Sequence, residues 1–111
     1  MCASLKTVLT LLPLNDGVYM DGFRIESYDN LFEAVAKLDK IEDLRKLFED
    51  MCTVKELEAM SQRLRVASLL KSGSNYQEIS LATGASTATI SRVNKCLMYG
   101  PGGYDLVLED K

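Results

Sequence analysis

Histidine is absent from the 111-residue sequence, and its absence excludes a large group of functional sites. Catalytic Ser–His and Cys–His pairs and histidine-ligated metal sites all require an imidazole. The cysteines, Cys2, Cys52 and Cys96, are odd in number, far apart and without a Cys-x-x-Cys motif. They indicate neither a zinc site nor a disulfide framework, and they fit the reducing cytoplasm. We therefore expect a protein that is not an enzyme, with no catalytic residues, metal or cofactor.

Long hydrophobic runs are also missing. The apolar stretch at residues 5–14 is well below the roughly 20 residues that a membrane-spanning helix needs, and no small-residue cleavage motif follows it. We expect no membrane partner. Hydrophobic residues at 47% and charged residues at 26% are typical of one globular domain. The sequence predicts a domain over residues 27–110, preceded by an N-terminal extension, residues 1–26, that can be flexible and has no core function.

Acidic residues are rare in one part of the chain, although the net charge of the whole is −3. Residues 60–100 contain a single acidic residue, Glu78. Five basic residues share this segment: Arg63, Arg65, Lys71, Arg92 and Lys95. A polyanion senses such a local charge within a Debye length of about 8–10 Å. The charge pattern therefore favours a nucleic-acid partner that the overall acidity would argue against.

From residue 27 onward the hydrophobic residues recur at helical spacing. Thr53 and Glu56 form a capping box that opens a long helix, and Gly73 can end it. The pattern predicts an all-α fold with helices at about residues 27–38, 41–51, 53–72, 75–83 and 86–98, and one or two turns within residues 104–109.

Residues 76–97 have the pattern of a helix-turn-helix. Gly84 can adopt the positive φ that the short turn requires, and Ser80 is small enough for two helices to cross at a steep angle. Ser86 can cap the second helix, and Ile79 and Ile90 return the two helices to the core.

The second of these helices has two different faces. Ile90, Val93 and Leu97 share the inward face. The outward face is small and polar at its beginning and basic at its end, and it contains Thr87, Ala88, Ser91, Arg92 and Lys95. Small side chains let a helix lie deep in the major groove, while Arg and Lys reach phosphates. The sequence therefore predicts that double-stranded DNA is a partner.

The run Gln62-Arg63-Leu64-Arg65, Gly73 and the block Thr-Gly-Ala-Ser-Thr-Ala-Thr-Ile-Ser-Arg at residues 83–92 resemble the Trp repressor superfamily, most closely its YerC/YecD-type branch. The resemblance implies an intertwined homodimer with six helices per chain, whose recognition helices enter successive major grooves. It implies a repressor of transcription at a palindromic operator. It also implies a bacterial cytoplasmic protein that lies on the nucleoid when bound to DNA.

The resemblance assigns DNA contacts to five positions: Gln77, Ser86, Thr87, Ala88 and Ser91. To these we add Arg92 and Lys95 as phosphate contacts. Gln77 departs from the Trp repressor, which has an arginine at this position that reads guanine. Because glutamine suits adenine better, we expect a different operator.

The resemblance also identifies a possible ligand site. Arg63 and Arg92 match the two arginines that sandwich the tryptophan corepressor, and Thr53 matches a residue lining that pocket. Val93, however, replaces a glycine beside the indole, and its methyl groups fill the space, so we expect no tryptophan gating. Arg63 can instead be a solvated or ion-paired surface residue, and Arg92 a phosphate contact alone.

Two alternative functions remain open from the sequence. One is a repressor gated by a tryptophan-like small molecule held between Arg63 and Arg92, with the effector unknown. The other is a helical protein–protein adaptor that uses the helix-turn-helix scaffold without binding DNA.

Overall fold

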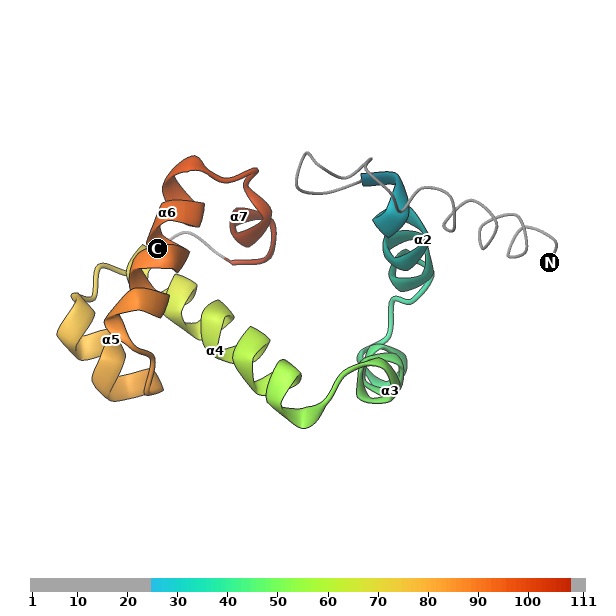
Figure 1. The fold of residues 1–111 in the computed structure, drawn as a ribbon, viewed down its shortest axis with the longest axis horizontal. Helices are drawn as coiled ribbons and strands as arrows, with labels where there is room; N and C mark the ends of the chain where they lie inside the picture. The colour runs from blue at the N-terminus through green and yellow to red at the C-terminus, as the bar shows by residue number, and fades with distance from the viewer. Residues whose placement is uncertain (1–24, 109–111) are drawn as a thin grey trace, which may run out of the picture. The chain divides into compact units, whose positions relative to one another are not determined.

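The computed structural model describes residues 25–108, and all regular structure in this range is helical. The helices are α2 (Ile25–Ala36), α3 (Ile41–Met51), α4 (Val54–Lys71), α5 (Tyr76–Thr83), α6 (Thr87–Tyr99) and α7 (Gly103–Val107), shown in Figure 1. The all-α prediction is thus confirmed. The main differences are at the two ends, where α2 begins at Ile25 and α7 ends at Val107. Residues 1–24 lie outside the described range, so the N-terminal extension stays a prediction.

The chain divides into two compact units, Met1–Leu47 and Phe48–Lys111. In the first unit, α2 carries an edge-to-face pair of rings, Tyr28 and Phe32, whose centroids are 6.4 Å apart. The following helix, α3, has Glu42 and Asp43 in its first turn. Negative charge at this position is favourable because the N-terminus of a helix carries a partial positive charge.

Two capping boxes fix where α4 and α5 begin. Thr53 Oγ1 accepts a hydrogen bond from Glu56 N (3.1 Å), and Glu56 Oε1 accepts one from Thr53 N (2.8 Å). Asn75 and Glu78 form the same reciprocal pair, at 2.9 and 2.8 Å. Each pair satisfies two N–H groups that have no partner inside the helix. The predicted starts of these helices, at Thr53 and Asn75, are therefore confirmed.

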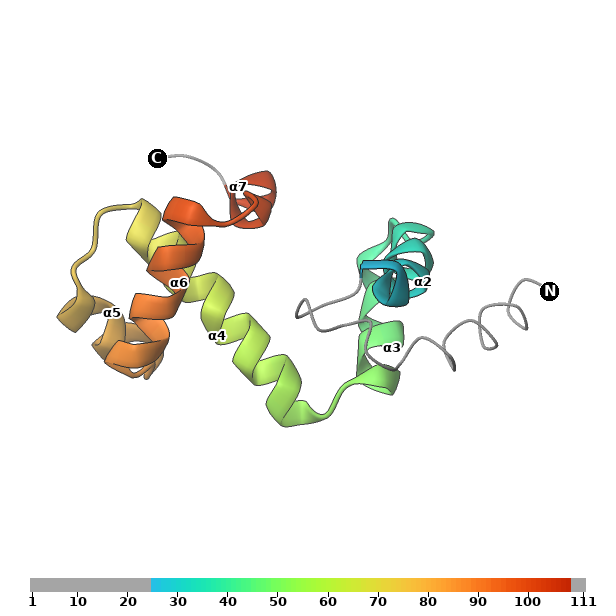
Figure 2. The same cartoon turned by 45° about the horizontal axis from the view of Figure 1, so that its top comes forward.

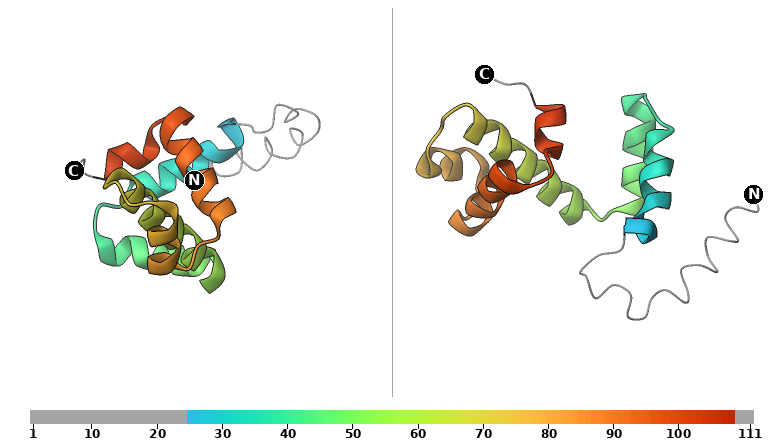
Figure 3. Two further views of the ribbon diagram at one scale, coloured as in Figure 1. Left: turned by 90° about the vertical axis from the view of Figure 1, so that its left-hand side faces the viewer. Right: turned by 90° about the horizontal axis from the view of Figure 1, so that it is seen from above.

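The hydrophobic core of the second unit lies where α4, α5 and α6 meet, with α5 and α6 against the C-terminal half of α4 (Figures 1 and 2). Its fully buried residues come from three helices and one turn: Val66, Ala67, Ile79, Ala85, Ile90 and Val93. Figure 3 shows the same cluster of helices from two further directions. Because these elements share one core, the helix-turn-helix packs against α4.

The last helix, α7, is joined to α4 by an ion pair. Lys71 Nζ lies 2.7 Å from Asp105 Oδ1. Tyr104 and Leu108, at either end of α7, pack partly buried against the core. The Lys71 charge, counted above as part of the basic segment, is therefore already paired.

Candidate DNA interface

The turn between α5 and α6 is held by side-chain hydrogen bonds. The Thr83 hydroxyl donates to Ile79 O (2.8 Å) and accepts from Ala85 N (3.1 Å). Ser80 Oγ donates to Ala85 O (3.0 Å), which explains why a small hydroxyl residue fits where the helices cross. Gly84 ends α5 in the left-handed conformation, with φ of 78°. The predicted helix-turn-helix is present, and hydrogen bonds of Thr83 and Ser80 hold its turn.

Replacing Gly84 by alanine is expected to reduce the free energy of unfolding by about 1 kcal/mol. An added Cβ would meet nothing within 4 Å, so the loss comes only from the positive φ. Urea unfolding measures it. Gly103→Ala is the matched control, because Gly103 also has open space around its Cβ position but lacks a positive φ. An unchanged Gly84→Ala midpoint would show that the turn tolerates a different backbone conformation.

The two faces predicted for α6 are present in the structure. Ile90 and Val93 are buried, and Leu97 is half-buried against the core. On the opposite side Thr87, Ala88, Arg92 and Lys95 are exposed, while Ser91 is half-buried. Gln77 is exposed on α5. The side chains selected from the sequence as DNA contacts are therefore accessible, although Ser91 is accessible only in part.

The five basic residues of the 60–100 segment differ in their pairing. Lys71 is bonded to Asp105, and Arg65 Nη2 donates to Ala82 O at 2.9 Å. Arg92, Lys95 and the half-buried Arg63 form no hydrogen bond or ion pair with any residue in the described range 25–108. Arg92 and Lys95 are thus the cations of α6 that are available to an anionic partner.

The Ser86 side chain is already engaged in hydrogen bonds at the start of α6. Its hydroxyl accepts a hydrogen bond from Thr89 N (3.1 Å) and donates to Thr89 Oγ1 (3.2 Å), which confirms it as the N-cap of α6. The backbone N–H groups of the first residues of α6, beginning with Thr87, point out of the helix end without an intrahelical partner. Such groups bind anions readily, because they lie at the positive end of the helix dipole.

The three residues matched to a corepressor site lie in different settings. The hydroxyl of Thr53 is engaged in capping α4, Arg63 is half-buried on α4 and Arg92 is exposed on α6. Val93 is 1% exposed and belongs to the buried core. No hydrogen bond or ion pair joins Thr53, Arg63 and Arg92 to one another among the described residues.

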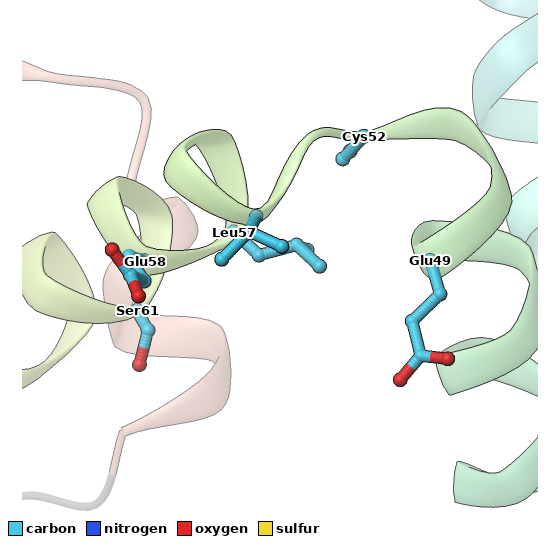
Figure 4. A pocket seen from close by; sticks show the side chains of 6 residues that line it. Glu49, Cys52, Leu57, Glu58 and Ser61 are labelled. Carbon is cyan, nitrogen blue, oxygen red and sulfur yellow. The ribbon is translucent and has the colours of Figure 1, made fainter.

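A cavity of about 540 Å³ lies in a different place, at the junction of α3 and α4 (Figure 4). It is lined by Glu49, Cys52, Val54, Leu57, Glu58 and Ser61. Its lining includes none of Thr53, Arg63 and Arg92. The carboxylates of Glu49 and Glu58 make it unfavourable for phosphate groups, so the cavity is not part of a DNA-binding surface.

Two polar residues of α4 form hydrogen bonds with the helix-turn-helix. Neither of them was assigned a role from the sequence. Gln62 Nε2 donates to Thr83 O at 3.1 Å, and Arg65 donates to Ala82 O as described above. Their spacing of three residues places them on one face of α4, but their partners are backbone carbonyls 21 and 17 residues further along the chain. Backbone acceptors leave no signal in the sequence.

This arrangement can be compared with known proteins. The family model of the Trp repressor protein matches residues 26–111, which is most of the chain. The chain belongs to the Trp repressor family. YerC of Bacillus subtilis (strain 168), itself described as uncharacterized, is 42% identical over 90 residues, covering 81% of this chain and 86% of YerC.

Two solved structures agree with this family assignment. One, from Staphylococcus aureus and named as a candidate Trp repressor, is 38% identical with a TM-score of 0.74, and the match covers 83% of this chain and 97% of that one. A TrpR-like protein from Eubacterium eligens ATCC 27750 is 40% identical with a TM-score of 0.73, and that match covers 81% and 99%. The family is one of helical DNA-binding regulators and not an enzyme family. No helix within residues 25–108 is long and apolar enough to cross a bilayer.

Proposed function

We propose that this Trp repressor family protein is a sequence-specific repressor of transcription that binds a palindromic DNA operator as a homodimer and is not gated by tryptophan. The observation that carries this function is the outward face of α6. Small exposed side chains precede two cations, Arg92 and Lys95, that have no partner within the described residues. Their opposite neighbours on the helix are buried, so the orientation of this face is fixed.

In this proposal Thr87, Ala88 and Ser91 meet base edges in the major groove, where their size allows close approach. Gln77 reads a base from α5, for which adenine is the best partner of an amide side chain. Arg92 and Lys95 bind phosphates, and Ser86 contributes through the helix end that it caps. The partner is double-stranded DNA, and the protein acts in the bacterial cytoplasm, on the nucleoid when bound to DNA.

Exposed hydrophobic side chains support the homodimer. Large apolar residues with more than 40% of their surface exposed occur on every described helix, and Leu81 on α5 reaches 88%. The side chains with more than half of their surface exposed include Phe32, Ile41, Val54, Met98, Tyr99, Leu106 and Val107. Soluble monomers rarely leave this much apolar surface uncovered, and a second copy of an intertwined chain would cover it.

The burial of Val93 supports independence from tryptophan. Its methyl groups are packed in the core, at the position where the Trp repressor has a glycine beside the indole. A repressor gated by an anionic small molecule is the second candidate, because Arg63 is half-buried and forms no ion pair within residues 25–108. A ligand-dependent change in operator affinity distinguishes the two.

Fluorescence anisotropy against duplexes selected from genomic DNA tests the proposal. Two cations from each of two protomers correspond to about four phosphate contacts, so affinity should fall about a hundredfold between about 50 and 200 mM salt. L-tryptophan should not change the affinity. DNA binding that requires tryptophan would contradict the expectation that Val93 fills the space for the indole. Failure to bind any duplex would favour the protein–protein adaptor.

A further inference from the structure

Two side chains from the middle of α4 bind the end of α5. Gln62 Nε2 donates to Thr83 O (3.1 Å) and Arg65 Nη2 donates to Ala82 O (2.9 Å), so two consecutive carbonyls of the last turn are occupied. We call this pair of hydrogen bonds the α4–α5 clamp. It belongs to the second compact unit, which also contains the helix-turn-helix.

The chemistry of the clamp suits its location. The last carbonyls of a helix have no partner inside it and lie at the negative end of the helix dipole. The guanidinium of Arg65 therefore forms a charge-assisted bond there, and the Gln62 amide satisfies the neighbouring carbonyl. Neither donor has to leave water completely, because Arg65 is exposed and Gln62 is half-buried.

The clamp continues into the turn that leads to α6. Thr83, whose carbonyl accepts from Gln62, also accepts a hydrogen bond from Ala85 N through its hydroxyl (3.1 Å). Ala85 O in turn accepts from Ser80 Oγ, and Ser86 caps α6 immediately afterwards. Hydrogen bonds thus connect α4 to the turn, and the backbone leads from the turn directly to Ser86, the N-cap of α6.

Hydrophobic packing alone holds α5 loosely. This helix has only eight residues, and Ile79 is its one fully buried side chain. Tyr76, at the beginning of α5, packs partly buried against the same core. Apolar contacts are non-directional, and because both lie in the first half of α5 they restrict its C-terminal end less. The two clamp bonds, made at the end of the helix away from Asn75, restrict its rotation.

We propose that Gln62 and Arg65 are positioning residues that set the orientation of α5, the turn and the start of α6, so that operator affinity depends on them although neither touches DNA. The part concerning affinity rests on the proposed function. The part concerning orientation does not, and it can be measured without DNA.

The test compares Gln62→Met and Arg65→Met, singly and together, with Lys71→Met. Each variant keeps a long side chain on α4. Lys71→Met is the matched control, because it removes a charge of α4 whose ion-pair partner, Asp105, lies on α7 and not on α5. Hydrogen exchange in the absence of DNA is followed at the amides of Gly84 and Ala85. Circular dichroism melting ensures that all variants are compared well below their unfolding temperatures.

We expect the double variant to exchange about tenfold faster at Gly84 and Ala85, with the amides of the α6 core unchanged. Operator affinity should fall about tenfold with an unchanged salt slope, because no phosphate contact is lost. Arg65→Lys, which keeps the charge and a donor, should recover much of the affinity. Lys71→Met should leave exchange at Gly84 and Ala85 as in the wild type.

Three outcomes decide the matter. Unchanged exchange at Gly84 and Ala85 in the double variant would overturn the clamp. A salt slope reduced by about two in Arg65→Met, one contact in each protomer of the dimer, would make Arg65 a phosphate contact and overturn its positioning role. If exchange rises but the wild-type protein binds no duplex, the orientation role stands and the proposed DNA-binding function fails.

Discussion

Thr87→Asp is expected to abolish specific DNA binding while leaving the protein folded. Thr87 is the first residue of α6 and is exposed, so in the proposed complex its side chain faces the groove. A carboxylate there is repelled by the phosphates on both sides, and the proposed dimer carries the substitution twice. We expect affinity to fall by at least about a hundredfold, because placing like charges together at an interface costs several kcal/mol.

The same substitution should not weaken the fold. An acidic residue in the first turn of a helix is stabilised by the helix dipole, by about 0.3–1 kcal/mol. α6 has no acidic residue in its first turn, so nothing offsets this gain. Loss of binding by Thr87→Asp, measured by anisotropy and accompanied by an unchanged or raised urea midpoint, therefore reports on DNA contact alone.

Thr87→Asn is the matched control for shape. Asparagine has nearly the size of aspartate but no charge, so it should retain much more affinity than the aspartate variant. Equal losses in the two variants would indicate that the groove rejects the shape of the side chain. Full binding by Thr87→Asp would remove the N-terminus of α6 from the interface.

The helices were predictable from the sequence because their signals are local. Capping residues such as Thr53 and Asn75 act within three residues of their partners, and Gly84 supplies a backbone conformation that other residues avoid. Hydrophobic spacing identified the buried side of α6 correctly. Signals of this range can be recognised without knowing which helices pack together.

The contacts that orient the helix-turn-helix were not predictable. Arg65 was counted only as one charge of a basic segment, whereas the structure bonds it to the carbonyl of Ala82. Lys71 and Asp105, 34 residues apart, form an ion pair that the charge count could not reveal. The Ser86 hydroxyl, chosen as a DNA contact, is occupied by Thr89. The Arg65 and Lys71 contacts depend on how separate segments meet in space, whereas the contact of Ser86 with Thr89 is local and follows from its predicted role as N-cap.

Val93 is a buried core residue whose replacement should lower stability. It is 1% exposed and lies in the core with Val66, Ile79 and Ile90. Val93→Ala removes buried methyl groups and should lower the free energy of unfolding by about 2 kcal/mol. Val93→Gly adds the cost of glycine within a helix, about 1 kcal/mol more. Urea unfolding at one fixed protein concentration measures both.

The same measurement tests whether tryptophan has a place to bind. A ligand that binds only the folded protein raises its free energy of unfolding. The increase grows with the logarithm of the ratio of ligand concentration to dissociation constant. We expect L-tryptophan to leave the wild-type midpoint unchanged, because Val93 occupies the position that a glycine leaves open in the Trp repressor. A rise in the urea midpoint of the wild type on addition of L-tryptophan would contradict the expectation that Val93 fills this space. A loss below about 1 kcal/mol in Val93→Gly would show that this side chain is not packed, since the helix penalty alone accounts for that amount.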